Sequence, residues 1–387
     1  MNRRRLLAGL GVGAVALGGC LSSDGDEEST RAEPLDPSID GAPMFQYDRQ
    51  NSGAGASTPP TEDGGGAVRF RTRLGDSVST SPAVVDGVVY VGSGRQIAAV
   101  DTSDGVQLWS AETTGAVRSS PAVVDGTVYV GTRGNLVYAL DADDGTERWR
   151  VEANGGVDAS PAVVDGTVYV ASRATSGRVY ALDADDGTER WSFETEYRVI
   201  SSPAVANGTV YVGGWDTAVY ALDAVDGTER WRVETDQPVL SSPAVVGGTV
   251  FVGGNDDRLY ALDADNGTER WRADTNGITT TPAVDDGTVY VGTETGSGRV
   301  YAFDTNDGSE RWHVDVETAV TTPLSVAGGT VQFGRRDGDV SVLDASDGSE
   351  RFRGETGGEV RSAPTVVGGI IYVGSNDGRL YAFGNGE

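Results

Sequence analysis

A single sequence unit recurs eight times along this chain and constrains the fold more than any other feature. Each unit contains a proline, usually after Ser or Thr, then a Gly-containing turn, a Val/Tyr segment, an Ala-x-Asp segment and an Asp-Gly turn. The unit prolines lie 39 to 42 residues apart, at Pro82, Pro121, Pro161, Pro203, Pro243, Pro282, Pro323 and Pro364. This period is typical of propeller blades or helical repeats. Because apolar residues alternate with period two, each unit is predicted to form four short strands.

The two ends of the repeat array predict how the ring closes. The last unit ends at residues 381–383 without a fourth strand, whereas residues 68–71 match the fourth-strand pattern and precede the first unit. We therefore predict an all-β, eight-bladed β-propeller of four-stranded antiparallel blades over residues 44–387, closed by the N-terminal strand. That strand should pair with residues 379–383 and hold the two ends together.

The charge of the chain is strongly negative. It carries 58 Asp and Glu against 30 Lys and Arg, a net charge of −28, and all 30 cations are arginine. Such a surface repels nucleic acid and anionic lipid head groups, so nucleic acid is not an expected partner. Molar salt shortens the screening length to about 3 Å and relieves the self-repulsion. We therefore expect a halophilic, haloarchaeal source, with an acidic protein from an ordinary cell as the alternative.

The N-terminus has the three parts of an export signal. Arg3, Arg4 and Arg5 precede an apolar stretch, and small residues lead to Cys20, the only cysteine. The stretch resembles a lipoprotein signal of the twin-arginine class, which implies cleavage after residue 19 and lipid attachment to Cys20. Residues 1–19 are thus the expected signal peptide, and the acidic residues 20–43 the expected disordered tether. An uncleaved N-terminal membrane anchor is the alternative.

A motif within the repeat carries a family resemblance. The spacing AxDxxxGxxxW, as in Ala139, Asp141, Gly145 and Trp149, recurs in six units, and Phe352 replaces the tryptophan in a seventh. It resembles the tryptophan-docking motif of the pyrroloquinoline quinone (PQQ) propeller family, which includes quinoprotein dehydrogenases and BamB-like lipoproteins. The resemblance implies that the tryptophans are structural and wedge against neighbouring blades: Trp109, Trp149, Trp191, Trp231, Trp271 and Trp312.

The inventory of catalytic side chains is nearly empty. His313 is the only histidine and is expected to be an exposed residue of an outermost strand, so a Ser/His/Asp triad or a histidine-based zinc site is improbable. An acid recurs in every Ala-x-Asp segment and is expected to accept hydrogen bonds from turn amides, with calcium binding as the alternative. These acids are Asp141, Asp183, Asp223, Asp263, Asp304 and Asp344. We therefore predict no catalytic residue and no metal site.

The family resemblance also raises an enzyme alternative, a PQQ-dependent alcohol or sugar dehydrogenase. In the resembling dehydrogenases the quinone lies beside a calcium ion, an acidic base and often a disulfide between adjacent cysteines. This chain has no cysteine pair, and its blades lack the insertions that build that pocket. We therefore expect no cofactor, and keep PQQ with calcium for the alternative only.

The positions where the repeat departs from its own pattern indicate a candidate binding face. Three residues before the unit prolines, Arg361, Ser79, Arg118 and Asp158 are predicted to form a polar arc at the channel mouth. Ile200, Leu240, Thr279 and Val320 are predicted to form an apolar arc opposite. The loops expected on the same face contribute Trp215, Arg133, Arg173, Arg335 and Arg336. Such groups suit an anionic or carbohydrate ligand or a partner protein. The alternative is that Arg118, Asp158 and Arg361 form an ion-pair set that plugs the channel.

These observations predict a binding or scaffolding module for envelope proteins or an extracellular ligand. We expect a monomeric propeller, held by lipid on Cys20 at the extracytoplasmic face of the cell membrane. The dehydrogenase and a purely structural surface protein are the other two hypotheses.

Overall fold

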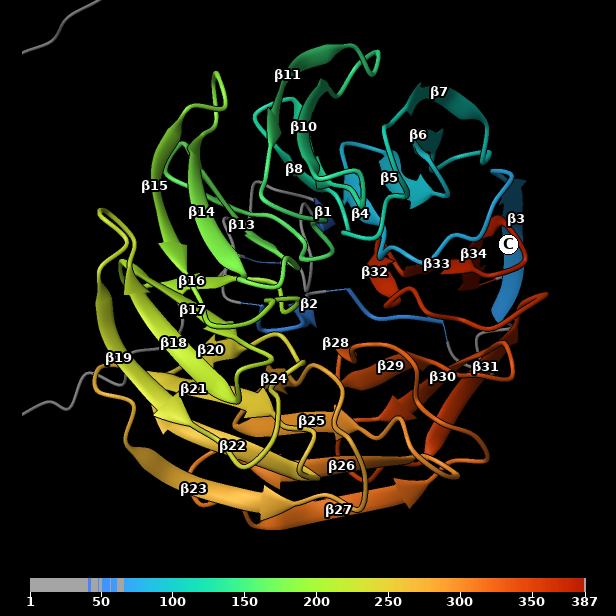
Figure 1. Cartoon of the computed structure of the whole chain (residues 1–387). Coiled ribbons are helices and arrows are strands. Elements are labelled where there is room, and N and C mark those ends of the chain that lie inside the picture. The colour runs from blue at the N-terminus through green and yellow to red at the C-terminus, as the bar shows by residue number, and fades with distance from the viewer. Residues whose placement is uncertain (1–40, 43–47, 49–50, 56, 61–65, 386–387) are drawn as a thin grey trace, which may run out of the picture.

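Eight antiparallel sheets form a closed ring around a central channel, which confirms the predicted eight-bladed β-propeller (Figure 1). The computed structural model describes residues 41–42, 48, 51–55, 57–60 and 66–385. The predicted signal peptide, Cys20 and the tether up to residue 40 lie outside the described residues. Within each blade, neighbouring strands are joined by tight turns or short loops, so the innermost strand lines the channel and the fourth strand forms the outer edge.

Each blade contains four strands in order from the channel outwards. Blades 1 to 4 are β4 (Ala83–Val85), β5 (Val88–Ser93), β6 (Gln96–Asp101), β7 (Gln107–Glu112); β8 (Ala122–Val124), β9 (Thr127–Gly131), β10 (Leu136–Asp141), β11 (Glu147–Glu152); β12 (Ala162–Val164), β13 (Thr167–Ser172), β14 (Arg178–Asp183), β15 (Glu189–Glu194); and β16 (Ala204–Ala206), β17 (Thr209–Gly213), β18 (Ala218–Asp223), β19 (Glu229–Glu234). Blades 5 to 8 are β20 (Ala244–Val246), β21 (Thr249–Gly253), β22 (Arg258–Asp263), β23 (Glu269–Asp274); β24 (Ala283–Asp285), β25 (Thr288–Gly292), β26 (Arg299–Asp304), β27 (Glu310–Asp315); β28 (Ser325–Ala327), β29 (Thr330–Gly334), β30 (Asp339–Asp344), β31 (Glu350–Glu355); and β32 (Thr365–Val367), β33 (Ile370–Ser375), β34 (Arg379–Asn385), β3 (Gly66–Arg73).

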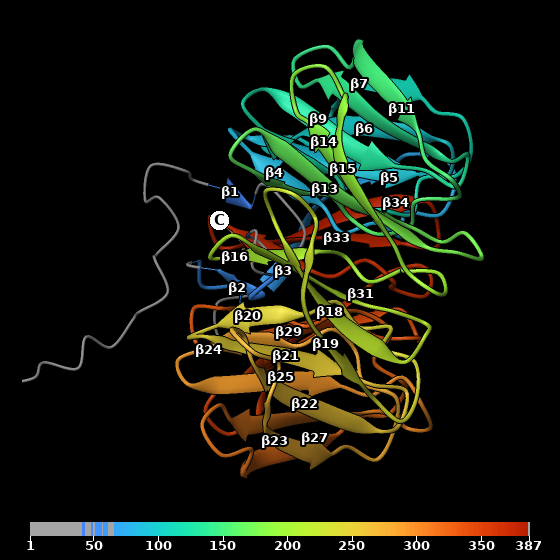
Figure 2. The same ribbon diagram turned by 60° about the vertical axis from the view of Figure 1, so that its left-hand side comes forward.

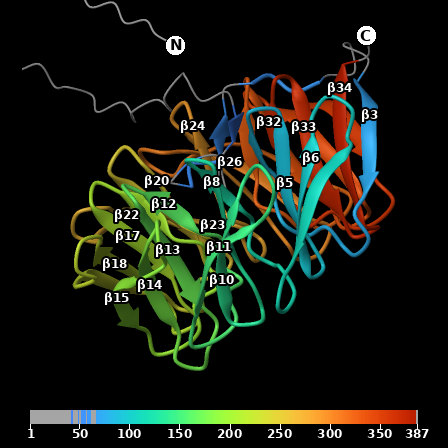
Figure 3. The ribbon, with the colours of Figure 1, turned by 90° about the horizontal axis from the view of Figure 1, so that it is seen from above.

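The N-terminal strand completes the eighth blade, as the sequence predicts. β3 pairs antiparallel with β34, from Val68 opposite Phe383 to Arg73 opposite Arg379. The two strands lie side by side although they come from opposite ends of the chain (Figure 3). Phe70 occupies the position of the docking tryptophan and would contact a Cβ placed on Gly105 of blade 1. The ring is therefore closed by hydrogen bonds and by packing.

The propeller has two different faces. The turn face carries the turns between the first and second and between the third and fourth strands, where Asp125 and Gly126 both have positive φ (48° and 68°). Asp and Gly tolerate this backbone conformation, which tight hairpins need. The loop face carries the loops between second and third strands and those that connect successive blades. Because the turn-face sequences repeat and the loop-face sequences vary, functional differences are concentrated on the loop face.

In six of the eight blades an indole joins the blade to the next one. Trp149 Nε1 donates a hydrogen bond of 2.9 Å to the carbonyl oxygen of Ala184, and the ring lies 2.8 Å from a Cβ built on Gly187. The same hydrogen bond runs from Trp109 to Ala142, Trp191 to Ala224, Trp231 to Ala264, Trp271 to Thr305 and Trp312 to Ala345. Blade 7 has Phe352 instead, which meets Phe383 of blade 8 edge to face at 5.9 Å. The seam between blades 7 and 8 therefore has ring packing in place of the indole hydrogen bond.

The hydroxyl residue before each proline also joins neighbouring blades. Ser120 Oγ accepts a hydrogen bond from Ser81 N, and Ser120 N donates to Ser160 Oγ in the next blade. The series continues through Ser202 and Ser242 to Thr281 of blade 6, and Ala363 N of blade 8 donates to Ser81 Oγ. In blade 7, counted back from the start of β28, Pro323 takes the place of Ser120 and has no hydroxyl group, while Thr322 takes the place of Ser119 and accepts from Gly334 N as Ser119 accepts from Gly131 N. The hydroxyl ring is therefore interrupted between blades 6 and 7.

The described N-terminal residues occupy the central channel. β1 (Gly41–Ala42) pairs antiparallel with β4 of blade 1, and β2 (Ala54–Gly55) pairs parallel with β28 of blade 7 (Figure 2). Between them, buried Asn51 donates to the carbonyl oxygens of Ser202 and Pro203 in blade 4. Gly41 lies opposite Val85, directly before the first turn of blade 1, so the chain meets the channel at the turn face. This segment ties blades on opposite sides of the ring together.

Candidate ligand and partner face

The charged residues at the channel mouth bind neighbours other than those predicted. Asp158 is largely buried and accepts two hydrogen bonds from the guanidinium of Arg133, both 3.0 Å, and one of 2.9 Å from Arg173. Arg133 is thereby held against blade 3, and the bonded carboxylate raises the pKa of Arg133. Asp158 is thus a rigid anchor that fixes two guanidinium groups on the loop face.

Arg118 and Arg361 are exposed at the same mouth. Arg118 donates to Ser79 Oγ at 2.9 Å, and Arg361 pairs with Glu359 at 3.0 Å. In the described structure the two do not pair with Asp158, so the alternative of an ion-pair set among Arg118, Asp158 and Arg361 is wrong. The physical reason is that Asp158 lies closer to the loop arginines of blades 2 and 3.

An arginine and an aromatic ring stack on blade 4. The Arg198 guanidinium lies 4.0 Å from the centroid of the Trp215 ring, and Trp215 N donates to the Arg198 carbonyl oxygen at 3.1 Å. The indole Nε1 is buried and has no hydrogen-bond partner among the described residues. A planar cation stacked on an indole forms a flat, half-exposed surface that binds planar or anionic groups. The sequence indicated Trp215 but not Arg198, which is recognised only from the stacking.

The predicted apolar arc is partly wrong because the unit proline of blades 6 and 7 lies one residue closer to the bridging residue. The loop before β24 is one residue shorter, and Pro323 lies one residue further from the start of β28 than the other unit prolines lie from their strands. Val117 and Val199 bridge to the second loop of their blades four residues before the proline. Thr279 and Val320 make the same bridge only three residues before theirs, and both are buried. The prediction took the residue three positions before each proline as a mouth residue, and in blades 6 and 7 that residue is the buried bridging residue. Ile200 and Leu240 remain half-buried at the mouth.

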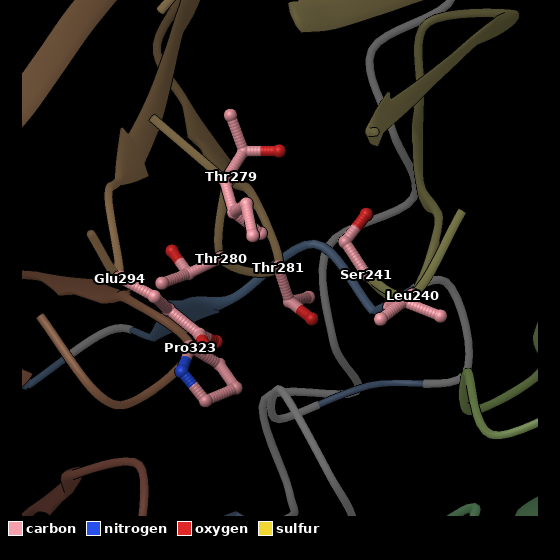
Figure 4. Close-up of a pocket in the computed structure, with 8 residues that line it drawn as sticks. Leu240, Ser241, Thr279, Thr280, Thr281, Glu294 and Pro323 are labelled. Atoms are coloured by element: carbon pink, nitrogen blue, oxygen red, sulfur yellow. The ribbon is translucent and has the colours of Figure 1, made fainter. Parts of the chain in front are cut away.

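A small cavity opens where the hydroxyl ring is interrupted. It has a volume of about 110 Å³ and is lined by Leu240, Ser241, Ile278, Thr279, Thr280, Thr281, Glu294 and Pro323. Figure 4 shows Glu294 beside Pro323, across the cavity from Leu240. The surrounding protein desolvates the carboxylate and raises the pKa of Glu294, whereas the charges of Arg361 and Arg336 lower it. Sequence reasoning missed Glu294, although it occupies the loop position that holds Arg133 in blade 2.

One loop arginine is not available to a ligand. The side chain of Arg335 is 1% exposed and pairs with Asp337 at 2.5 Å and Glu317 at 3.0 Å. Ser341, opposite Phe333, stands where blade 2 has Tyr138 opposite Val130, and Arg335 bonds to Asp337 as Tyr220 bonds to Asp216 in blade 4. The prediction that Arg335 belongs to the binding face is therefore wrong. Arg336 is exposed and faces Glu359 at 4.0 Å.

The repeated acids bind their own turns and an arginine. Asp141 accepts from Asp143 N at 2.9 Å and from Arg148 Nη2 at 2.8 Å, and Arg148 also donates to Thr127 Oγ1. These hydrogen bonds lower the pKa of Asp141 and of its equivalents Asp183, Asp223, Asp263, Asp304 and Asp344. Both carboxylate oxygens of Asp141 therefore accept hydrogen bonds from its own blade, as the structural interpretation of these acids predicts. The arginine partner was not foreseen.

Two further observations concern metals and membranes. Over the described ranges, no three His, Cys, Asp or Glu side chains are grouped so that they could hold a metal ion. His313 is exposed and lies 2.7 Å from Glu310 Oε1. The part of the chain that the structure describes has no helix with the length and apolarity needed to span a membrane.

The fold is a closed propeller scaffold, and its loop face is the surface whose residues vary from blade to blade. The chain belongs to the family described as outer membrane protein assembly factor BamB, whose model matches residues 61–136, 113–197, 175–298 and 296–386. A comparison with proteins of curated function found no match.

Solved structures share the fold at low sequence identity. BamB from Moraxella catarrhalis is similar with a TM-score of 0.72 and 22% identity, covering 82% of this chain and 99% of that one. Quinohemoprotein alcohol dehydrogenase from Comamonas testosteroni gives 0.74 and 17%, covering 90% and 81%. The computationally designed Ika8 protein gives 0.73 and 18%, covering 82% and 99%. Because a scaffold protein, an enzyme and a designed protein share this architecture, the likeness shows the fold and leaves function to the site.

Proposed function

We propose that the chain is a membrane-anchored, extracytoplasmic binding or scaffolding module whose loop face holds an envelope protein or an extracellular ligand. The observation that carries the proposal is the contrast between the two faces. The loop face combines Arg118, the Asp158 pair of arginines, Arg361 and the Arg198–Trp215 stack from separate blades. The turn face repeats one sequence.

The position of the N-terminal segment supports an orientation. Because Gly41 meets blade 1 beside its first turn, a tether that ends there leaves the ring at the turn face. A lipid on Cys20 would then hold the turn face towards the membrane and direct the loop face away from it. The proposed lipid anchor and the proposed binding face are therefore compatible. Membership in the BamB family supports a role in protein interaction.

The competing proposal is a PQQ-dependent alcohol or sugar dehydrogenase, which the alcohol dehydrogenase likeness keeps open. The donor set does not fit a quinone site of the expected kind. A disulfide between adjacent cysteines cannot form in a chain with one cysteine, and residues 51–55 bond to the inner strands within the channel. Reconstitution with PQQ and calcium tests this alternative. Quinone absorbance together with dye-linked alcohol oxidation would replace our proposal.

The binding proposal is tested on the native protein, extracted from membranes in high salt. Partners captured by the wild type are identified and their affinity is measured against Arg118→Ala and Trp215→Ala. We expect at least tenfold weaker binding by these variants and unchanged binding by Arg272→Ala on an outer edge. Equal binding by all four proteins would reject the loop face. Mass spectrometry of the native N-terminus tests the anchor, because an intact Met1 would exclude lipidation of Cys20.

A further inference from the structure

The seam between blades 8 and 1 differs from every other blade junction in three ways. Its outer strands have a different charge pattern, its turn-face end is apolar, and its loop-face end contains a cavity. These features use none of the residues of the proposed function, although the cavity opens among loop-face residues of blade 1. β3 of blade 8 and β7 of blade 1 form the outer edges of this seam (Figure 1).

The first difference is a row of arginines on β3. Six blades begin their outer strand with Glu-Arg and end it with Glu or Asp, whereas β3 contains Arg69, Arg71 and Arg73 and no acid. Phe70 and Thr72 face Gly105 of blade 1, so Arg71 and Arg73 lie on the opposite face of the strand. Both are exposed, and neither forms an ion pair with a residue that the structure describes. In a chain with a net charge of −28, arginines without an ion pair are unusual.

The second difference is the loss of charge on β7. In blade 2, Arg148 joins Asp141 to Thr127 across the sheet. The equivalent pair in blade 1 is Leu108 and Val88, and Leu108 is 51% exposed. Val106, in the preceding turn, and Val68 on β3 are also exposed, at 56% and 45%. Of the charged side chains that normally protect such edge strands from pairing, β7 retains only Glu112 at its end.

The third difference is a cavity where the repeat normally has a tyrosine. In blade 2, Tyr138 on β10 accepts a hydrogen bond from Thr114 N, and Tyr180 and Tyr381 accept equivalent bonds in their blades. In β6 the residue is Ala98, which is fully buried. A cavity of about 570 Å³ opens at Gly75, the counterpart of Thr114, and is lined by Leu74, Gly75, Asp76, Ser93, Arg95, Gln96, Glu112 and Thr113. A Cβ added to Gly75 would meet nothing within 4 Å. The loop residue that binds a tyrosine hydroxyl in other blades therefore faces a cavity at this seam.

We propose that the edge of β3 is a docking site for an extended segment of a partner protein in which acidic and apolar residues alternate, one aromatic side chain filling the cavity at Gly75. A segment that adds to β3 as a further strand presents alternate side chains to its two faces. Its acidic residues meet Arg71 and Arg73. Its apolar residues turn towards Leu108 and the cavity, where a tyrosine hydroxyl takes the place that Tyr138 has in blade 2.

Charge distinguishes this occupant from the other two. The chain's own acidic residues 20–43 contain no aromatic residue that could fill the cavity. In a second copy, residues 193–197 alternate in this way, but Glu194 already pairs with Arg178 and Phe193 packs against Tyr220. The cavity wall contains charges of both signs, Asp76, Glu112 and Arg95, and its acids outnumber its one cation, so the group that enters it should be neutral, whereas β3 selects for acids. Only a segment that carries both acidic and neutral aromatic side chains complements the β3 arginines and the cavity at once.

The probe for the experiment is the peptide acetyl-Glu-Tyr-Glu-Val-Glu-Tyr-Glu-amide, with its Tyr→Ala counterpart as reference. Binding to the full chain is measured by calorimetry. We expect the tyrosine peptide to bind at least tenfold more tightly than the alanine peptide. Ala98→Tyr restores the repeat residue, so it should abolish this difference while leaving the thermal midpoint unchanged or higher. Ala98→Leu provides a smaller filling residue if the tyrosine variant does not fold.

Charge reversal tests the other half of the proposal. Arg71→Glu with Arg73→Glu should weaken both peptides at least tenfold, and Arg272→Glu on the outer edge of blade 5 should leave both unchanged. Hydrogen exchange should show protection of residues 71–76 by the tyrosine peptide. The proposal is overturned if a folded Ala98 variant still prefers the tyrosine peptide, or if the double charge reversal binds like the wild type.

Discussion

Trp149 Nε1 donates a 2.9 Å hydrogen bond to the carbonyl oxygen of Ala184, so the outer strand of blade 2 is fastened to a turn of blade 3. The indole also packs against Tyr129 with ring centroids 5.9 Å apart. Because the same contact recurs around most of the ring, the stability of the propeller depends on repeated junctions between neighbours.

Substitutions at this junction should separate the hydrogen bond from the packing. Trp149→Phe retains an aromatic ring but leaves the Ala184 carbonyl without its donor, and we expect a loss of about 1–2 kcal/mol. Trp149→Ala also removes the buried ring, and we expect a loss of about 3–5 kcal/mol. Urea unfolding at constant salt measures both. Equal losses for the two variants would show that the hydrogen bond, and not the ring, dominates the junction.

The channel segment should contribute to global stability through Asn51. Its amide donates to two carbonyl oxygens of blade 4, at 3.3 and 3.2 Å, and Asn51→Asp replaces both donors by acceptors. We expect a loss of about 1–3 kcal/mol, together with faster proteolysis of residues 41–60. Asn207→Asp, in an exposed turn where blades 2 and 3 have Asp125 and Asp165, is the matched control and should behave like the wild type. Unchanged proteolysis of Asn51→Asp would mean that the segment does not depend on this contact.

Acid should weaken the turn face in a predictable range. Hydrogen bonds from Ser346 and the guanidinium of Arg351 lower the pKa of Asp344 to about 2. Because the folded pKa lies below the value of about 3.9 in an unfolded chain, the stabilisation is complete above that value and is lost as the pH falls towards 2. Thermal midpoints measured between pH 5 and pH 2 should fall less steeply for Asp344→Asn than for the wild type. Equal dependence of the thermal midpoint on pH in the two proteins would contradict the lowered pKa of Asp344.

Arg148 bridges Asp141 and Thr127 in blade 2, and blade 1 lacks this bridge because it has Leu108 and Val88 at the equivalent positions. Arg148→Leu alone leaves Asp141 and Thr127 without their shared donor, and we expect a loss of about 1 kcal/mol. Adding Thr127→Val reproduces the Leu108 and Val88 pair of blade 1, so the double variant should lose less than the sum of the single variants. Additive losses in urea unfolding would show that the two positions do not interact.

Salt should stabilise this protein. Its net charge of −28 makes the folded ring repel itself at low ionic strength. We expect the thermal midpoint to rise from 0.1 M to molar KCl and to level off as the screening length approaches about 3 Å. A midpoint that falls with added salt would reject the halophilic interpretation.

The repeat alone was sufficient to predict the architecture. Period-two alternation and the Asp-Gly turns predict four strands per unit, and the missing fourth strand after Phe383 predicts that residues 68–71 complete the last blade. Both follow from local patterns, because strand formation and turn chemistry depend on neighbours in the chain. The structure confirms them down to the pairing of Val68 with Phe383.

Side-chain partners were decided by the tertiary structure. Asp158 binds Arg133 and Arg173 instead of Arg118 and Arg361, because blade curvature sets which loop ends meet. Pro323 lies one residue earlier in its loop than the other unit prolines, which changes the alignment of the mouth residues and interrupts the hydroxyl ring at the cavity that contains Glu294. The sequence thus determined which residues repeat. Only the closed ring determined which of the exceptions face one another, because those contacts join residues that are distant in the chain.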